Sequence, residues 1–273
     1  MIYLQLRSVL DDINVAAIKT GMLANKDIVR AVADALNALP SLPPLVVDPV
    51  CVSTSGHTLL EHKALDALTA ELLPLATVVT PNAHEAALLL LQRRRAADSP
   101  GGADSLPAQI ASIEGMVRAA RELCALGLRA VLLKGGHVSN GLTYLADVEA
   151  AAASEDLQVH SIERDGLVRP GTNMEILFKA AGQDPAASVH DVPVVVDVLC
   201  EKGGDQGGRG DTGRCTLFVR PYLDSTSTHG TGCTLSAALA CALARGEPRT
   251  HSTHPFSPSF SFLSHYARRA LQL

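Results

Sequence analysis

The sequence contains no tryptophan and few other aromatic residues, and it carries no excess of basic charge. Aromatic residues make up 3% of the 273 positions, and 23 basic against 28 acidic residues give a formal net charge of -5. Surfaces that bind nucleic acid or anionic membranes need a concentrated basic excess. The basic run Arg93–Arg95 follows an apolar helical pattern and is typical of a solvated helix end. We therefore expect neither nucleic acid nor a membrane as a partner.

The sequence also lacks the features of secreted and membrane proteins. Its six cysteines form no CxxC pair, whereas disulfide-rich secreted domains are small and dense in turns. No stretch approaches the roughly 18 consecutive apolar residues of a membrane-spanning helix. Residues 1–7 do not resemble a charged leader followed by an apolar segment. We expect a cytoplasmic protein, and a hydrophobic content of 47% is enough to bury the core of one large domain.

Short apolar runs alternate with longer helical patterns along the first half of the chain. The strands are expected at 15–18, 45–48, 77–80 and 130–133, and the helices at 25–39, 63–73, 83–91 and 113–126. Thr20 and Gly21 are expected to form a turn after the first strand. The strands are apolar throughout, which is typical of a parallel sheet covered on both faces. The predicted fold class is α/β, a doubly wound and mostly parallel sheet with helices on both faces.

Two segments interrupt this alternation. Residues 93–110 are polar and rich in Ala, Pro and Gly, and residues 147–190 mix alanine runs, charges and Gly/Pro without steady periodicity. We interpret both as insertions, the second as a long surface loop, because structureless loops of that length are rare inside a compact core.

Strand patterns return later in the chain, at 192–199 and 215–219. We predict one domain over residues 1–246, followed by a tail at 247–273 that is weakly helical at 266–271.

A glycine-rich turn, Thr228–Thr234, runs directly into a small-residue helical pattern. Gly230 and Gly232 let the backbone approach a ligand closely, and the helix start presents unpaired N–H groups that bind phosphate. Thr231 lies in the same turn, and Cys233 falls at the helix start, where a thiol can act as a base. The alternative is a plain glycine turn before a packing helix, with Cys233 buried.

Asn82 and Glu85 follow the strand at 77–80 and are three residues apart across a helix start. An amide and a carboxylate placed there suit a hydrated Mg²⁺ that bridges nucleotide phosphates. The alternative is structural, because an Asn cap with Glu at the third helical position resembles a capping box.

Two further strands end in charged residues. Asp48 ends the strand at 45–48, and ligands of open α/β sheets bind outside the carboxyl ends of the strands. Lys134 and Gly135 follow the strand at 130–133 and suit contact with phosphate. A turn aspartate before proline and a simple glycine turn are the structural alternatives. Together these sites supply a phosphate cradle, a metal anchor, a cation and a base, which are the components of phosphoryl transfer.

Five motifs occur in the order found in one known family. They are Lys19–Leu23, Val47–Val50, Thr80–Ala86, Leu133–His137 and His229–Ser236. With these motifs the chain resembles the hydroxymethylpyrimidine/phosphomethylpyrimidine kinases of thiamine biosynthesis, a branch of the ribokinase-like superfamily. The resemblance covers most of residues 1–146 and 192–246.

The resemblance implies ATP-dependent phosphorylation of hydroxymethylpyrimidine and then of its monophosphate, with ATP and Mg²⁺ as cofactors. It implies an anion hole formed by Gly230, Thr231, Gly232 and Cys233, with Cys233 as the base. It implies nucleotide contacts from Lys134, Gly135, Asn82 and Thr231, and Mg²⁺ held by Glu85, Asn82 and Asp48. The pyrimidine pocket would be lined by Met22, Val50 and Cys233.

Family members begin with a strand, a Gly-rich segment and a pyrimidine-binding glutamine that would all precede Met1 in this sequence. The resemblance therefore implies a complete ATP half and a truncated pyrimidine half. Two other functions stay open at this point: a pyridoxal kinase of the same superfamily, and a non-catalytic nucleotide-binding remnant. Because relatives commonly dimerise, a homodimer is a further expectation.

Overall fold

The computed structural model of this chain describes residues 1–51, 62–96, 110–135, 143–155, 157–161, 193–202, 214–222 and 230–245. The helix predicted at 266–271 and the first residues of the glycine-rich turn, Thr228 and His229, lie outside these ranges.

Helices and strands alternate through the first half of the chain, as predicted. In order they are α1 (Ile2–Asp12), β1 (Ile18–Thr20), α2 (Lys26–Asn37), β2 (Leu45–Val47), α3 (His62–Ala67), β3 (Val78–Val79), α4 (Ala83–Ala96), α6 (Ile113–Ala125) and β4 (Ala130–Leu133). A π-helical turn at Leu68–Leu72 and a 3₁₀ turn at Leu73–Leu75 continue α3. The second half contains β5 (Thr143–Tyr144), α7 (Leu145–Glu155), β6 (Gln158–Ser161), β7 (Pro193–Glu201), β8 (Arg214–Pro221) and α9 (Thr231–Arg245).

The strands form one sheet whose main path runs β1-β2-β3-β4-β7-β8-β6, with β5 paired to the start of β7. The first four strands are parallel neighbours. β7 runs antiparallel to both β4 and β8, and β6 lies parallel to β8. The predicted fold class, a doubly wound and mostly parallel α/β sheet, is confirmed.

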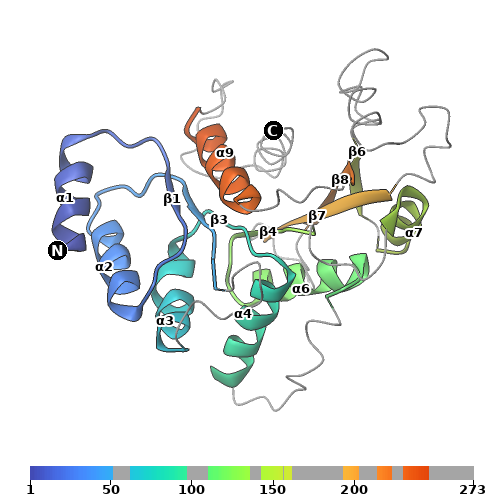
Figure 1. Ribbon diagram of the computed structural model, residues 1–273, viewed down its shortest axis with the longest axis horizontal. Coiled ribbons are helices and arrows are strands. Elements are labelled where there is room, and N and C mark those ends of the chain that lie inside the picture. The colour runs from blue at the N-terminus through green and yellow to red at the C-terminus, as the bar shows by residue number, and fades with distance from the viewer. Residues whose placement is uncertain are drawn as a thin grey trace, which may run out of the picture.

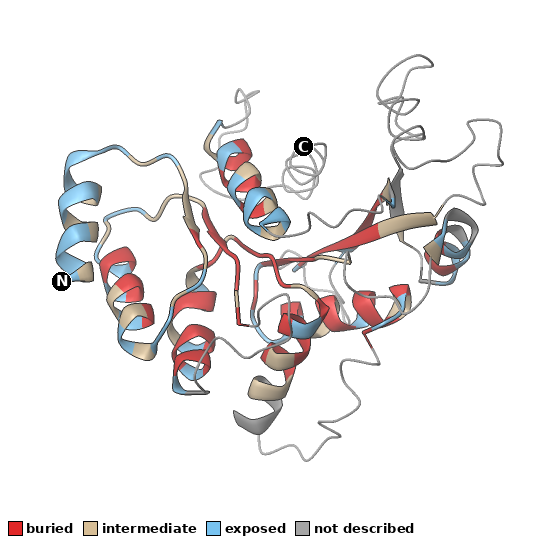
Figure 2. Ribbon diagram, viewed as in Figure 1, coloured by how far each residue is buried: buried red, intermediate tan, exposed pale blue. Residues whose placement is uncertain are grey.

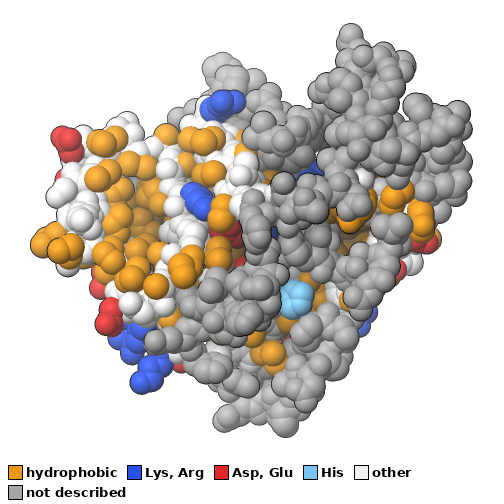
Figure 3. All heavy atoms as spheres, viewed as in Figure 1, with side chains coloured by type: hydrophobic (Ala, Val, Ile, Leu, Met, Phe, Trp, Pro, Cys, Tyr) orange, Lys and Arg blue, Asp and Glu red, His pale blue; other side chains and the backbone are white. Residues whose placement is uncertain are grey.

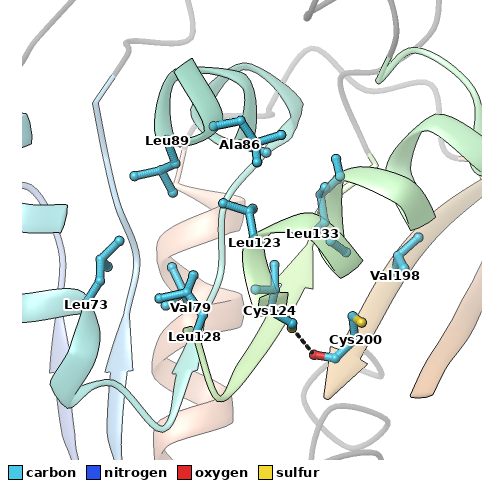
Figure 4. Packing of buried hydrophobic residues seen from close by; sticks show 14 of the residues in the cluster. Leu73, Val79, Ala86, Leu89, Leu123, Cys124, Leu128, Leu133, Val198 and Cys200 are labelled. Carbon is cyan, nitrogen blue, oxygen red and sulfur yellow. Dashed lines mark hydrogen bonds between the residues drawn. The ribbon is translucent and has the colours of Figure 1, made fainter. Parts of the chain in front are cut away.

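Helices cover both faces of this sheet, with α2, α3, α4 and α6 on one face and α9 on the other (Figure 1). The strand side chains alternate between these faces. Val47, Val79 and Leu133 belong to the larger core beneath the four helices, whereas Val46 and Leu132 pack with α9. Burial on both faces explains why the strands are apolar throughout. Figure 4 shows the larger core close up, where the Cys124 thiol donates to the Cys200 carbonyl at 3.4 Å.

The helix starts follow the capping chemistry of the sequence. Asn25 caps α2 by accepting a hydrogen bond from the Ile28 N–H at 3.0 Å, as predicted. Ser112 caps α6 in the same way through the Gly115 N–H at 3.1 Å. Gly127 follows α6 with a φ of 107°, a left-handed conformation that glycine adopts without steric cost.

α1 lies at the edge of the molecule and has no buried residue, so it is exposed over most of its surface (Figure 2). Hydrophobic side chains gather on this side of the molecule (Figure 3). Among the large hydrophobic residues that the structure describes, the most exposed are Met1, Leu4, Val9, Ile13 and Met22. Within the ranges given above, no helix combines the length and the apolar character that crossing a bilayer requires.

Three predictions about element positions are wrong. The first strand is β1 at Ile18–Thr20 instead of 15–18, because its register is set by pairing Ile18 with Leu45, and Thr20 is part of the strand instead of a turn. α4 continues to Ala96, past the predicted end at residue 91.

The expected long loop at 147–190 is wrong for its first part. Residues 145–155 form α7, because their alanine-rich composition favours a helix without marked amphipathicity. Residues 158–161 form β6, which pairs with β8. Residues 162–190 lie outside the described ranges.

Candidate active site

Polar side chains meet at the carboxyl ends of β2, β3 and β4, beside the first turn of α9. Because strand side chains alternate, Asp48, Thr80 and Lys134 all fall on the face that α9 covers. These residues are 32 and 86 positions apart along the chain and come together only through the parallel pairing. The structure thus brings together Asp48, Glu85 and Lys134, which the sequence singled out at the ends of three separate strands.

Asp48 lies at the centre of the cluster and is 1% exposed. Its Oδ1 accepts hydrogen bonds from Lys134 Nζ at 2.9 Å and from Thr80 Oγ1 at 3.2 Å. Its Oδ2 accepts from Ser236 Oγ of α9 at 3.2 Å. A buried carboxylate is stable only when it is paired and hydrogen-bonded, and Asp48 satisfies both conditions.

Lys134 is held from two directions. Its backbone N–H donates to the Pro81 carbonyl at 2.8 Å and extends the pairing of β3 with β4. Its ammonium lies 2.9 Å from Asp48 and 4.0 Å from Glu85 Oε2. The same ammonium lies beside Gly232, where an added Cβ would come within 3.1 Å of Nζ. The cation predicted from sequence therefore faces the first turn of α9.

Asn82 and Glu85 form the capping box that the sequence left open as their structural role. The Asn82 N–H donates to Glu85 Oε2 at 2.8 Å, and the Glu85 N–H donates to Asn82 Oδ1 at 2.9 Å. Burial raises the pKa of Glu85 to about 7, although nearby Lys134 acts in the opposite direction. Cys51, whose thiol pKa burial raises to about 12, lies next to this carboxyl group.

The first turn of α9 is open to the surroundings. Gly230 has a φ of 82°, a left-handed conformation that other L residues rarely adopt, and its carbonyl accepts from the Thr234 N–H at 2.9 Å. Thr231 and Cys233 are exposed, and Gly232 is half-buried. The alternative in which Cys233 is a buried packing residue is wrong, because its side chain is exposed in the first turn of α9.

The two residues expected to line the pyrimidine pocket lie after β1 and β2. Met22 is 51% exposed in the segment that follows β1. Val50 is half-buried, and its N–H donates to the Asp48 carbonyl at 2.9 Å. A backbone turn therefore ties Val50 to Asp48, whereas Met22 contributes to the exposed apolar surface.

Four polar residues around this cluster were not predicted from the sequence: Thr80, Ser236, Asp197 and Arg220. Ser236 bonds Asp48, as described above. Asp197 of β7 is 1% exposed and accepts from the Gly135 N–H at 2.9 Å and from Arg220 of β8 at 2.5 Å. Asp197 could have been identified from the sequence, because it is the only charged residue within the apolar run 193–200 and a charge in such a run indicates a buried partner.

The buried carboxylates offer the oxygen ligands that Mg²⁺ prefers. The high pKa of Glu85 indicates that its ionised form is under-compensated by the protein, so a bound divalent cation would favour ionisation. Among the described residues no group of three or more His, Cys, Asp or Glu side chains is arranged to hold a metal. Mg²⁺ sites of phosphoryl transfer commonly use one or two carboxylates together with water and substrate phosphates.

Comparison with known proteins assigns this arrangement to a family. The family model described as phosphomethylpyrimidine kinase matches residues 1–166 and 187–267. The hydroxymethylpyrimidine/phosphomethylpyrimidine kinase of Streptomyces coelicolor is 31% identical over 243 residues, which are 89% of this chain and 60% of that protein. The chain thus spans about three fifths of the length of this relative.

Solved structures show the same fold. A pyridoxal kinase from Bacillus subtilis in complex with ADP superposes with a TM-score of 0.57 at 22% identity, covering 98% of this chain and 66% of that structure. A phosphomethylpyrimidine kinase from Clostridium difficile gives 0.52 at 21% identity, covering 99% and 74%. At this level of identity the likeness concerns the fold alone.

The family match covers part of the stretch predicted as an insertion at 147–190. It continues through residue 166 and resumes at residue 187, so residues 167–186 are left unmatched. The match continues to residue 267, into the segment predicted as a tail.

Proposed function

The chain belongs to the phosphomethylpyrimidine kinase family, and on that premise we propose that it transfers the γ-phosphoryl group of ATP to hydroxymethylpyrimidine and then to its monophosphate. The observation that carries the proposal is the position of Lys134, whose ammonium lies between the buried carboxylate Asp48 and the glycine turn at Gly232. A cation beside unpaired helix N–H groups is a site for phosphate charge.

In this proposal the nucleotide phosphates bind between Lys134 and the first turn of α9. Gly230, Thr231 and Gly232 form the anion hole with their backbone N–H groups. Asn82, Thr231 and Gly135 are the other proposed nucleotide contacts. Because the Gly135 N–H already donates to Asp197, the proposed contact of Gly135 with the nucleotide is a van der Waals contact, and we expect the charged contact with phosphate at that turn to come from the Lys134 ammonium.

Cys233 is the proposed base. The substrate hydroxyl gives its proton to the Cys233 thiolate while its oxygen bonds to the γ-phosphorus, and the bond between that phosphorus and the β–γ bridging oxygen breaks to release ADP. The exposure of Cys233 at the start of α9 supports this role, because the thiol is accessible to a bound alcohol.

Glu85, Asn82 and Asp48 are the proposed holders of Mg²⁺, partly through water. A bound Mg²⁺ would neutralise charge on the transferred phosphoryl group. Met22 and Val50 are proposed to contact the pyrimidine ring, together with Cys233. We further propose a cytoplasmic protein that forms a homodimer, as expected from the sequence.

The proposal is tested by a coupled ADP-release assay on the full chain with ATP, Mg²⁺ and hydroxymethylpyrimidine. We expect substrate-dependent ADP release that falls by at least about a hundredfold in Cys233→Ala, because general-base catalysis contributes about 10²–10⁴. Cys241→Ala is the matched control, since Cys241 is exposed on the same helix. Turnover of pyridoxal in place of the pyrimidine would contradict the proposed substrate and indicate a pyridoxal kinase. Equal rates in the parent chain and in Cys233→Ala would refute the role of the thiol.

A further inference from the structure

A second ion pair continues the active-site cluster across the sheet. Asp197 of β7 and Arg220 of β8 lie on the α9 face, because their strand neighbours Val198 and Val219 belong to the opposite core. Asp48, which follows β2, and Lys134, which follows β4, lie on the same face. Charges of alternating sign therefore follow one another across these strands, and the turn after β4 lies between the two pairs.

Lys134 and Gly135 connect the two ion pairs. The Lys134 ammonium binds Asp48 at 2.9 Å, and the next N–H along the chain, that of Gly135, binds Asp197 at 2.9 Å. On the other side the Lys134 N–H is fixed to Pro81 at 2.8 Å. Two successive backbone N–H groups are thus held by different strands, one by the end of β3 and one by a side chain of β7.

The turn also lies unusually close to β7. A Cβ added to Gly135 would fall 1.8 Å from the Val196 carbonyl oxygen, so only glycine fits against this strand. Close contact alone does not fix the direction of the turn. The hydrogen bond from the Gly135 N–H to the Asp197 carboxylate fixes the direction of the turn. The negative charge of Asp197 makes it a strong acceptor, and Arg220 neutralises that charge.

We propose that Asp197 is a positioning residue for nucleotide binding, which holds the turn after β4 so that the Lys134 ammonium faces the first turn of α9. This inference rests on the proposed binding of ATP at that turn. Asp197 itself touches Gly135 and Arg220, and its effect on the nucleotide passes through the backbone. Arg220 serves to neutralise Asp197, so the pair acts as one uncharged unit.

The test compares two double variants of the full chain that carry the same charge. Asp197→Asn/Arg220→Met keeps an oxygen that can accept from the Gly135 N–H, whereas Asp197→Ala/Arg220→Met does not. We expect the alanine variant to show a KM for ATP about three- to tenfold above that of the asparagine variant, the range that one hydrogen bond provides. The KM for the pyrimidine alcohol should differ by less than about twofold, because the change acts on the nucleotide side.

Glu201→Ala is the control for a purely structural effect. Glu201 is a buried carboxylate on the same strand, four residues from Asp197, opposite Arg214 and away from the turn. The Glu201→Ala variant should have a lower melting temperature than the parent chain and an unchanged KM for ATP. Equal KM values for ATP in the two double variants, or the same increase in Glu201→Ala, would overturn the inference.

Calorimetric titration of ATP with the same proteins separates this inference from the proposed catalysis. A parent chain that binds ATP without turning over would refute the proposed activity, and the affinity ratio of the double variants would still decide the role of Asp197. A folded parent that binds no ATP would overturn both. If the alanine variant does not fold, Asp197→Ser/Arg220→Met replaces it, because the shorter serine side chain does not reach the Gly135 N–H.

Discussion

The ion pair between Asp48 and Lys134 makes a quantitative prediction. The Asp48 side chain is 2% exposed and that of Lys134 is 15% exposed, with 2.9 Å between the charged atoms. Removing one partner of a buried pair leaves an uncompensated charge and costs about 3–5 kcal/mol of the free energy of unfolding. We expect about 3 kcal/mol for Asp48→Asn, the lower end, because an amide oxygen still accepts from Thr80 or Ser236.

Lys134→Met should cost a similar amount at pH 8, because it leaves the carboxylates of Asp48 and Glu85 without their cation. The double variant Asp48→Asn/Lys134→Met removes both charges of the pair and leaves the Glu85 carboxyl group, whose pKa burial raises and whose protonation removes the remaining charge. It should therefore be more stable than either single variant, with a coupling free energy of about 2 kcal/mol or more.

The assay is urea unfolding of the parent and the three variants at pH 8, with the slope m compared to verify that the unfolded states are equivalent. Single variants that each lie within about 1 kcal/mol of the parent would refute the argument. So would a double variant whose loss equals the sum of the two single losses, since the charges would then be independent.

Three further predictions follow from single residues. Burial raises the pKa of Glu201 to about 7 from 4.5, so the folded chain holds a proton that the unfolded chain releases, and stability should fall by up to about 3 kcal/mol between these pH values. Glu201→Gln should remove this loss, and urea unfolding at pH 5 and pH 8 checks it; an unchanged pH dependence in the variant would contradict the shift. Gly135→Ala places a methyl group 1.8 Å from the Val196 carbonyl, so the turn must move, at about 1–3 kcal/mol of stability and with a measurable loss of ATP affinity by calorimetry; unchanged affinity would show that this turn is not part of the site. Gly230→Ala should cost about 1–2 kcal/mol in thermal unfolding, because its φ of 82° is left-handed and no atom of the described residues lies within 4 Å of the added methyl group, and Gly230→Asn should cost less; equal losses in the two variants would point to sterics instead of backbone conformation.

The parallel half of the fold could be predicted because its strands are short, apolar on both faces and separated by capped helices. β4 begins and ends where its apolar run does, at Ala130 and Leu133. β1 could not be placed as well, since a run of three strand residues is defined by its pairing with β2 and several neighbouring registers have the same apolar character. The alanine-rich α7 escaped prediction because helix propensity, unlike amphipathicity, leaves no periodic pattern.

The active-site cluster could be predicted in position but not in detail. Asp48, Asn82, Glu85 and Lys134 each follow an apolar strand, and the geometry of a parallel sheet brings such residues to one edge. The spacing of Asn82 and Glu85 fits both a capping box and a metal site. The sequence alone does not distinguish these two roles, because the cation near Glu85 is Lys134, which follows a different strand.

Asp197 illustrates the limit of the sequence most clearly. A carboxylate inside an apolar strand indicates a buried partner, but its partners lie 62 and 23 positions away, at Gly135 and Arg220. Which residues meet it depends on the order of β4, β7 and β8 in the sheet, and this order is a property of the whole fold.

The central claim is that ATP phosphates bind between Lys134 and the first turn of α9, and calorimetric titration of Mg²⁺·ATP into the full chain tests it most directly. We predict saturable binding of one nucleotide per chain that Lys134→Met weakens by at least about tenfold, the loss expected for a charged hydrogen bond. A chain that unfolds cooperatively yet binds no ATP, or a Lys134→Met variant with the affinity of the parent, would contradict the account.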